Sequence, residues 1–155
     1  MPPPSFNTIL KRFDGSIGRA LCDAAAYGRA HILKILSENG VDLNYKCDFY
    51  YGLSLLHIAA GMPRNKKALK YLLENGATLF IDDMQNEFGK TPLMIACSNG
   101  SPSEELTMLL LKFGADAKCK QASKGYTAYD FLLQVDTKGF EPSPEFIEIL
   151  RMATL

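Results

Sequence analysis

The sequence predicts an all-α solenoid of about four stacked helix pairs, joined by hairpin-like fingers and flanked by modified terminal caps. The first observation behind this prediction is an internal repeat. The segment Asn39-Gly40-Val41-Asp42 recurs as Asn75-Gly76-Ala77-Thr78 and as Phe113-Gly114-Ala115-Asp116, with spacings of 36 and 38 residues. The second observation is that each unit holds two apolar stretches that are too short to form stable helices alone. Such units must stack to bury their apolar faces, which favours a one-dimensional array.

The first helix of each unit is expected to begin after a Ser or Thr. Ser54, Thr91 and Thr127 each precede a short helical stretch, where a side-chain oxygen can accept a backbone N–H. Pro92 takes the first helical position, where its missing N–H costs nothing. Small residues such as the pair Ala59-Ala60 follow, and they allow neighbouring helices to approach closely.

The second helix of each unit carries apolar residues at i, i+3 and i+4 spacing, which is typical of a buried face. These stripes consist of Ile32, Leu33, Ile35 and Leu36, then Leu69, Leu72 and Leu73, then Leu106, Leu109, Leu110 and Leu111. Gly40, Gly76 and Gly114 follow the stripes and predict helix ends. The polar stretch after each glycine predicts a hairpin-like finger.

Both ends of the chain are expected to be modified. Residues 5–13 are apolar enough to form a covering helix, and Ser143 before Pro144 predicts the start of a last helix. We therefore expect one domain over residues 1–155. Its parts are a cap segment at 1–16 and repeats at 17–51, 52–88, 89–124 and 125–155, of which the first and last are atypical.

The repeated pattern resembles the ankyrin repeat. The closest matches are Gly89–Ala96, which reads G-K-T-P-L-M-I-A, and Leu109–Asp116, which ends in G-A-D. The resemblance covers roughly residues 17–135. The period here is longer than the family's period of about 33 residues. The extra residues fall in the turn between paired helices and in the fingers, the longest finger being 80–88.

No pattern of catalytic or cofactor-binding residues stands out. Lys+Arg 17 and Asp+Glu 17 balance, which argues against electrostatic binding to nucleic acid or to a membrane surface. Gly89-Lys90-Thr91 lacks the upstream glycine of a phosphate-binding loop, and no calcium-loop or zinc spacing occurs. We expect no cofactor and no metal. An enzyme built on Cys22 beside His57 is an alternative, but the resemblance implies that His57 braces the next turn.

The cysteines are expected to be reduced. Cys22, Cys47, Cys97 and Cys119 show no C-x-x-C spacing, and a chain of this size does not need disulfides to fold. The first residues lack the pattern of a signal peptide, and no apolar run is long enough to span a membrane. These observations favour a monomeric intracellular protein of the cytoplasm or the nucleus.

The resemblance also implies where a partner would bind. In the family, the variable positions flank the glycine of each finger and follow the small pair of the first helix. On this chain the predicted partner-binding residues are Tyr27, Tyr50, Tyr51, Leu53, Met62, Glu87, Phe88, Lys90, Ser98, Asn99, Lys124 and Tyr126. The same rule marks Ala26, Ser123 and Gln134. Exposed aromatic residues are frequent binding anchors, although Phe49, Phe80 and Phe88 could instead pack finger against finger.

The function predicted from the sequence is a non-catalytic protein–protein interaction module that binds through its concave face and its finger loops. The alternative is a scaffold or inhibitor fragment of a larger ankyrin-containing protein. The fold itself does not choose between partners.

Overall fold

The computed structural model describes residues 1–98, 102–134 and 141–155. Within these ranges the secondary structure is helical apart from one short hairpin. The helices are α1 (Phe6–Arg12), α2 (Ile17–Ala26), α3 (Ala30–Glu38), α4 (Leu55–Ala60), α5 (Lys66–Glu74), α6 (Pro92–Ser98), α7 (Glu104–Lys112), α8 (Ala128–Gln134) and α9 (Pro144–Thr154), and the strands are β1 (Lys46–Cys47) and β2 (Leu53–Ser54). The predicted all-α class is confirmed.

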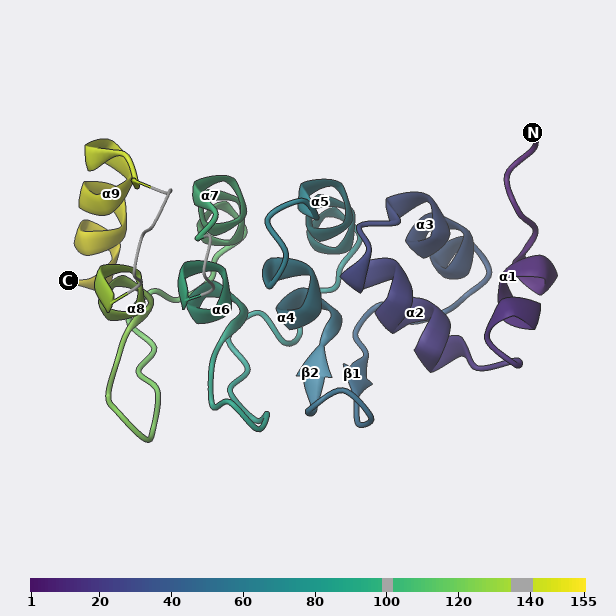
Figure 1. Cartoon of the computed structure of the whole chain (residues 1–155), viewed down its shortest axis with the longest axis horizontal. Helices are drawn as coiled ribbons and strands as arrows, with labels where there is room; N and C mark the ends of the chain where they lie inside the picture. Colours follow the sequence, from purple (N-terminus) through teal and green to yellow (C-terminus); the bar gives the residue numbers. More distant parts are fainter. Residues whose placement is uncertain (99–101, 135–140) are drawn as a thin grey trace.

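The helices lie in two rows. The row of α2, α4, α6 and α8, here called the inner helices, carries the fingers, and α3, α5, α7 and α9, the outer helices, form the second row (Figure 1). Successive inner helices contact one another, as do α3, α5 and α7, and α9 packs against α8. The helix α1 covers α2 and α3, and the chain ends lie at opposite ends of the stack. This arrangement is the predicted solenoid of four helix pairs.

The inner helices begin where the sequence predicts. The Ser54 hydroxyl accepts the N–H of His57, and the His57 ring accepts the N–H of Ser54, so the two residues form a reciprocal capping box. Thr91, Thr127 and Ser143 cap α6, α8 and α9, each accepting a backbone N–H three residues on. At α8 the cap is again reciprocal, because the Asp130 carboxylate accepts the N–H of Thr127. Local side-chain chemistry therefore sets these helix starts.

The core runs through the whole stack. Leucines of the outer helices are fully buried, namely Leu33, Leu36, Leu69, Leu72, Leu106 and Leu110. The small residues of the inner helices are also buried, namely Ala24, Ala25, Ala59, Ala60, Ala96 and Cys97. Because the small residues let the inner helices pack closely, the leucines of one unit reach those of the next, which is how short helices gain stability from their neighbours.

Asn65, at the start of α5, links the first two units. Its side-chain amide donates to the carbonyls of Ala25 and Ala26 at the end of α2, at 2.8 and 2.9 Å. These bonds satisfy carbonyls that a helix end leaves without partners. Gly28 makes room for this contact, because it has a φ of +68° and a side-chain carbon there would lie 2.7 Å from the Asn65 amide oxygen.

In the described residues, only the first finger forms strands. Strands β1 and β2 pair antiparallel, with Lys46 opposite Ser54 and Cys47 opposite Leu53. The expectation that all four cysteines are reduced is wrong at this point. Cys47 forms a disulfide with Cys22 on α2, and their Cα atoms are 6.9 Å apart. Stacking brings the first finger onto α2, and this contact cannot be read from chain length or from cysteine spacing.

The other two cysteines, Cys97 and Cys119, are free, as expected. Burial raises the pKa of Cys97 to about 12. Burial also raises the pKa of Cys119, with smaller contributions from the charges of Asp82 and Asp116. Both thiols are therefore held in the protonated form at neutral pH, which makes them poor nucleophiles.

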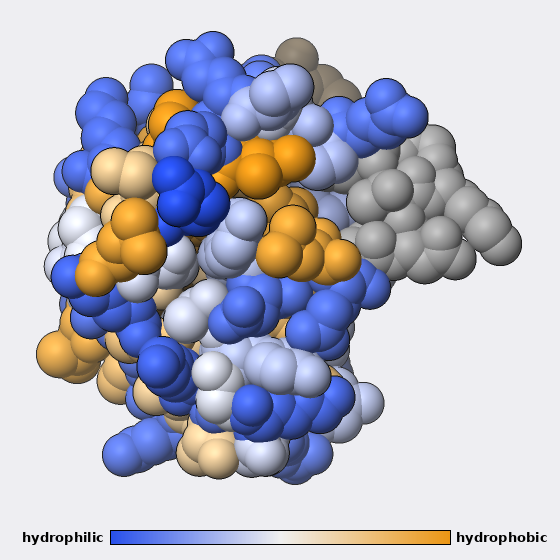
Figure 2. Space-filling view, turned by 90° about the vertical axis from the view of Figure 1, so that its left-hand side faces the viewer, coloured by the Kyte–Doolittle hydropathy of each residue, from blue (hydrophilic) through white to orange (hydrophobic). Residues whose placement is uncertain are grey.

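The surface at the C-terminal end of the stack is mostly hydrophilic, with separate apolar patches (Figure 2). Exposed apolar side chains of α8 and α9 include Leu133, Ile149 and Met152. A largely polar outer face is expected of an atypical terminal repeat.

The predicted partner-binding residue Asn99 lies outside the described residues. None of the helices in the described ranges has both the length and the apolar character required to cross a membrane.

Candidate binding groove

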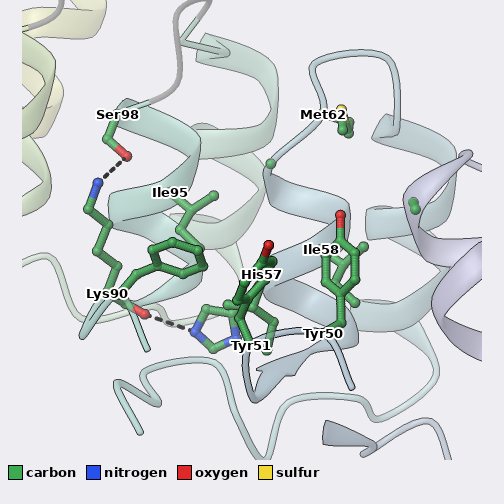
Figure 3. A pocket seen from close by; sticks show the side chains of 12 residues that line it. Tyr50, Tyr51, His57, Ile58, Met62, Lys90, Ile95 and Ser98 are labelled. Atoms are coloured by element: carbon green, nitrogen blue, oxygen red, sulfur yellow. Dashed lines mark hydrogen bonds between the residues drawn. The ribbon is translucent and has the colours of Figure 1, made fainter. Parts of the chain in front are cut away.

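A cavity of about 300 Å³ opens on the inner-helix face, between the first finger and the second. We call it the inter-finger cavity. Its lining is formed by Ala26, Tyr50, Tyr51, Leu53, His57, Ile58, Gly61, Met62, Phe88, Lys90, Ile95 and Ser98. Figure 3 shows how these side chains converge from the fingers and from α4 and α6. Most of them are apolar or aromatic, so the cavity suits an apolar side chain of a ligand.

Three aromatic rings form the finger side of the cavity. The rings of Tyr50 and Tyr51 lie 5.6 Å apart, edge to face, and those of Tyr51 and Phe88 lie 5.3 Å apart. Phe88 therefore packs against the neighbouring finger, one of the two expected roles, and also lines the cavity. The three side chains remain 39%, 50% and 45% exposed. A cluster of exposed rings of this kind is typical of a binding surface.

The backbone at Tyr51 is unusual. The N–H of Leu53 donates to the carbonyl of Tyr50 at 3.1 Å and closes a tight turn. The two central residues, Tyr51 and Gly52, have φ angles of +58° and +66°. Turns of this type normally carry Gly, Asn or Asp at these positions, because a bulky side chain is disfavoured in the left-handed region. Tyr51 therefore has an unfavourable backbone conformation, and its ring lies beside the cavity.

His57 connects two units beneath the cavity. Its Nδ1 accepts the Ser54 N–H at 3.2 Å, so the proton of the neutral ring lies on Nε2. Nε2 is 2.9 Å from both the Asp83 carbonyl and the Lys90 carbonyl, to which it donates. Asn86 also donates to the Lys90 carbonyl, at 2.8 Å. The expected bracing role of His57 is confirmed, and burial lowers the pKa of the ring.

Lys90 supplies the charge at the other side of the cavity. Its Nζ donates to the Ser98 hydroxyl at 3.0 Å (Figure 3) and lies 4.3 Å from the centre of the Phe131 ring. Burial lowers the pKa of this lysine, and the nearby charge of Lys124 lowers it further. Over residues 1–98, 102–134 and 141–155, no carboxylate forms an ion pair with Lys90.

The structure brings together seven of the twelve residues predicted from the sequence. Those that line the inter-finger cavity are Tyr50, Tyr51, Leu53, Met62, Phe88, Lys90 and Ser98. Ala26, marked by the same rule, lines it as well.

Four other predicted residues lie elsewhere. Tyr27 lines a separate, adjoining hollow that also contains Tyr50, and its ring lies 5.1 Å from the guanidinium of Arg29. Glu87 is exposed on the second finger, beside the cavity but not in its lining. Lys124 and Tyr126 belong to the third finger, where the lysine lies 5.7 Å from the tyrosine ring.

The sequence did not predict four of the lining residues as binding residues, namely His57, Gly61, Ile58 and Ile95. Of these, only Ile58 and Ile95 carry aliphatic side chains. They occupy the same position in successive inner helices, directly before the small residues that end each motif. The signal was available, because an apolar residue at this repeated position projects from the inner-helix face in each unit. The prediction covered only the positions that flank the finger glycine or follow the small pair, so the position before the pair was not included.

The described residues give little support to a metal site or to a catalytic Cys–His pair. No group of three or more His, Cys, Asp or Glu residues there is arranged to hold a metal ion. The sulfur of Cys22, which a Cys–His pair would use, is bonded to Cys47.

Comparison with known proteins agrees with this architecture. Two family profiles, both described as ankyrin repeats, match residues 7–83 and 72–132. The chain is 31% identical over 130 residues to an IkB-like protein of African swine fever virus (strain Badajoz 1971 Vero-adapted), covering 79% of this chain and 52% of the relative. An IkB-like protein from the Pretoriuskop isolate is 30% identical over the same length and the same shares.

A third match is shorter. The chain is 42% identical over 67 residues to an L-asparaginase of Dirofilaria immitis, which covers 43% of this chain but only 11% of that protein. The chain spans about half the length of the IkB-like relatives. Repeat spacing, stacked helix pairs and both profile matches point to one family. The chain belongs to the ankyrin-repeat proteins.

Proposed function

We propose that this chain is a non-catalytic module that binds another protein through its concave face and its finger loops. Ankyrin repeats generally act as protein–protein interaction modules, and the IkB-like relatives favour a binding or inhibitory role. The observation that carries the proposal is the open inter-finger cavity edged by Tyr50, Tyr51 and Phe88. Three clustered rings that are partly exposed to water are unfavourable, and a partner that covers them gains binding free energy from their burial.

The protein is further proposed to act as a monomer inside the cell, with no cofactor and no nucleic-acid ligand. Equal numbers of basic and acidic residues support the last point, because nucleic-acid binding relies on an excess of positive charge.

The test is affinity capture from a lysate of source cells, followed by quantitative mass spectrometry. The variant Tyr50→Ala/Tyr51→Asn removes both rings, and asparagine tolerates the positive φ at position 51. We expect the variant to lose at least about 2 kcal/mol of partner binding, which is close to thirtyfold in affinity.

The matched control is Leu79→Ala. Leu79 is 71% exposed on the second finger and does not line the inter-finger cavity, so its removal deletes exposed apolar area at another place. A partner that the control retains and the double variant loses would support the proposal. Equal recovery of every captured protein by wild type and double variant would contradict it.

A second candidate is that this array is the scaffold or inhibitor portion of a longer protein. The supporting observation is that the IkB-like relatives extend to about twice the matched length. An antibody against residues 1–155 would then detect a larger band in source-cell extract, whereas a band of 17.1 kDa would contradict this alternative.

A further inference from the structure

We propose that the inter-finger cavity selects an extended segment of its partner protein that carries a large apolar side chain next to an aspartate or glutamate. This inference rests on the proposed function and names the chemistry of the partner. The apolar side chain would enter the cavity, and the carboxylate would bind Lys90 together with Lys124. The argument depends on the shape of the cavity, on the position of its one lysine, and on the charges around that lysine.

The cavity itself has room for little more than one or two side chains. A volume of about 300 Å³ is at the lower limit for a site that encloses a whole small molecule. The cavity lies between two fingers and is partly open to solvent, so an extended chain can pass along the row of inner helices. The lining from Ile58, Met62 and Ile95 is aliphatic, so the side chain that enters should be large and apolar.

The lysine at the edge is only partly satisfied. Lys90 is half-buried, and among residues 1–98, 102–134 and 141–155 its ammonium group contacts the Ser98 hydroxyl and the Phe131 ring. An ammonium group has three N–H donors and keeps its charge at a desolvation cost when it leaves water. A carboxylate from a partner would offset that cost.

The charged groups near Lys90 also favour an acidic residue on the partner. Lys124, on the third finger, lies 5.7 Å from the Tyr126 ring, and that ring lies 5.7 Å from the Phe131 ring over which Lys90 is placed. A second positive group is therefore near this side of the cavity.

Several of the other charged groups around the groove are engaged within the protein, whereas Glu87 is exposed beside the cavity and does not line it. Asp23 forms an ion pair with Arg29, and the Lys46 ammonium lies 3.0 Å from Asp83. In the described part of the chain, Lys90 has no such partner, so a positive site is left for an acidic residue.

The experiment uses a library of random peptides displayed on phage, selected against the full chain. Counter-selection against Tyr50→Ala/Tyr51→Asn removes peptides that bind outside the groove. Enriched sequences are then made as synthetic peptides amidated at the C-terminus, so that only Asp or Glu side chains supply carboxylates. Affinities are measured by fluorescence anisotropy for wild type, for Lys90→Gln, and for the matched control Lys67→Gln on the outer helix α5.

The inference expects enriched peptides to share a large apolar residue beside Asp or Glu. Replacing that acid by its amide in the peptide, or Lys90 by Gln in the protein, should weaken binding about five- to tenfold, and Lys67→Gln should not. Raising the salt concentration should weaken binding of the acidic peptide alone. The peptide substitution leaves the protein unaltered, so this arm holds even where Lys90→Gln impairs folding.

Two results would overturn the inference in distinguishable ways. Peptides that need Tyr50 and Tyr51 but show no preference for an acid would refute the acidic partner and leave the proposed groove in place. A selection that enriches no peptide for wild type over the double variant would contradict both the inference and the groove as a peptide-binding site.

Discussion

His57 is a buried ring that depends on staying neutral. Its Nδ1 accepts the Ser54 N–H, and its Nε2 donates to the Asp83 carbonyl of the second finger and to the Lys90 carbonyl of the next unit. Adding a second proton would place an N–H against the Ser54 N–H and charge a group that is 1% exposed. The lowered pKa of His57, caused chiefly by burial, follows from this geometry.

The lowered pKa of His57 predicts that the free energy of unfolding depends on pH. Below a pH of about 6.5, the unfolded chain protonates His57 while the folded chain resists protonation. The unfolded state then binds more protons, so the free energy of unfolding should fall as the pH drops from 6.5 toward 5.5, by up to about 1.4 kcal/mol per pH unit. Urea unfolding at several pH values measures this. If the same slope persists in His57→Gln, other groups cause it.

At position 51 we predict the reverse of the usual order of stability of Ala and Gly variants. Replacing a residue by Ala usually gives a more stable protein than replacing it by Gly, but a φ of +58° penalises any side-chain carbon. Tyr51→Gly should therefore be about 1 kcal/mol more stable than Tyr51→Ala. Leu79, which is exposed and lacks a positive φ, provides the comparison, and there Ala should be at least as stable as Gly. Thermal unfolding of the four variants decides the point.

At the scale of elements, a carboxylate ties the start of the last helix to the neighbouring outer helix. Glu104, at the start of α7, accepts the N–H of Ser143 and its hydroxyl, which ties the beginning of α9 to the neighbouring outer helix. The adjacent Glu105 forms only an exposed ion pair with Lys66 at 3.2 Å. Two neighbouring acidic residues therefore differ in what they support.

We predict that Glu104→Ala lowers the free energy of unfolding by about 1–2 kcal/mol, because it leaves the Ser143 N–H without this partner. Glu105→Ala should change it by less than about 1 kcal/mol, since exposed ion pairs contribute little. Hydrogen exchange should accelerate in α9 for the first variant only. Equal effects of the two substitutions would show that the Glu104 contact does not hold α9.

At the scale of the whole molecule, the Cys22–Cys47 disulfide concentrates stability at the N-terminal end. It joins α2 to the finger that carries Tyr50 and Tyr51. Repeat arrays are stabilised mainly by contacts between neighbouring elements, and this covalent link fastens the first finger to α2 within the first predicted repeat, 17–51. Disulfides are rare in the reducing cytosol, so the compartment that holds the protein decides whether this link persists.

Reduction is therefore expected to lower the free energy of unfolding by about 3 kcal/mol, the magnitude for a closed loop of this length. Cys22→Ala/Cys47→Ala without reductant should resemble the reduced wild type. Urea unfolding with and without dithiothreitol measures the difference. Alkylation of the unfolded, unreduced chain should modify two cysteines, and modification of all four would contradict the pairing.

Much of the fold follows from the sequence. The repeat period, the caps at Ser54, Thr91, Thr127 and Ser143, and the buried leucine stripes were all predicted, because they depend on residues within a few positions of one another. Most of the cavity lining was also predicted, since the variable positions recur at fixed places in each unit.

The tertiary structure decided the rest. The Cys22–Cys47 bond joins the first inner helix to the first finger, 25 residues further along the chain. Ile58 and Ile95 meet in one cavity and Lys90 lies over Phe131, and both contacts join residues of different units. Such contacts depend on how far each unit is shifted and rotated against the next. That displacement results from the packing of the whole interface, and no short segment of the sequence encodes it.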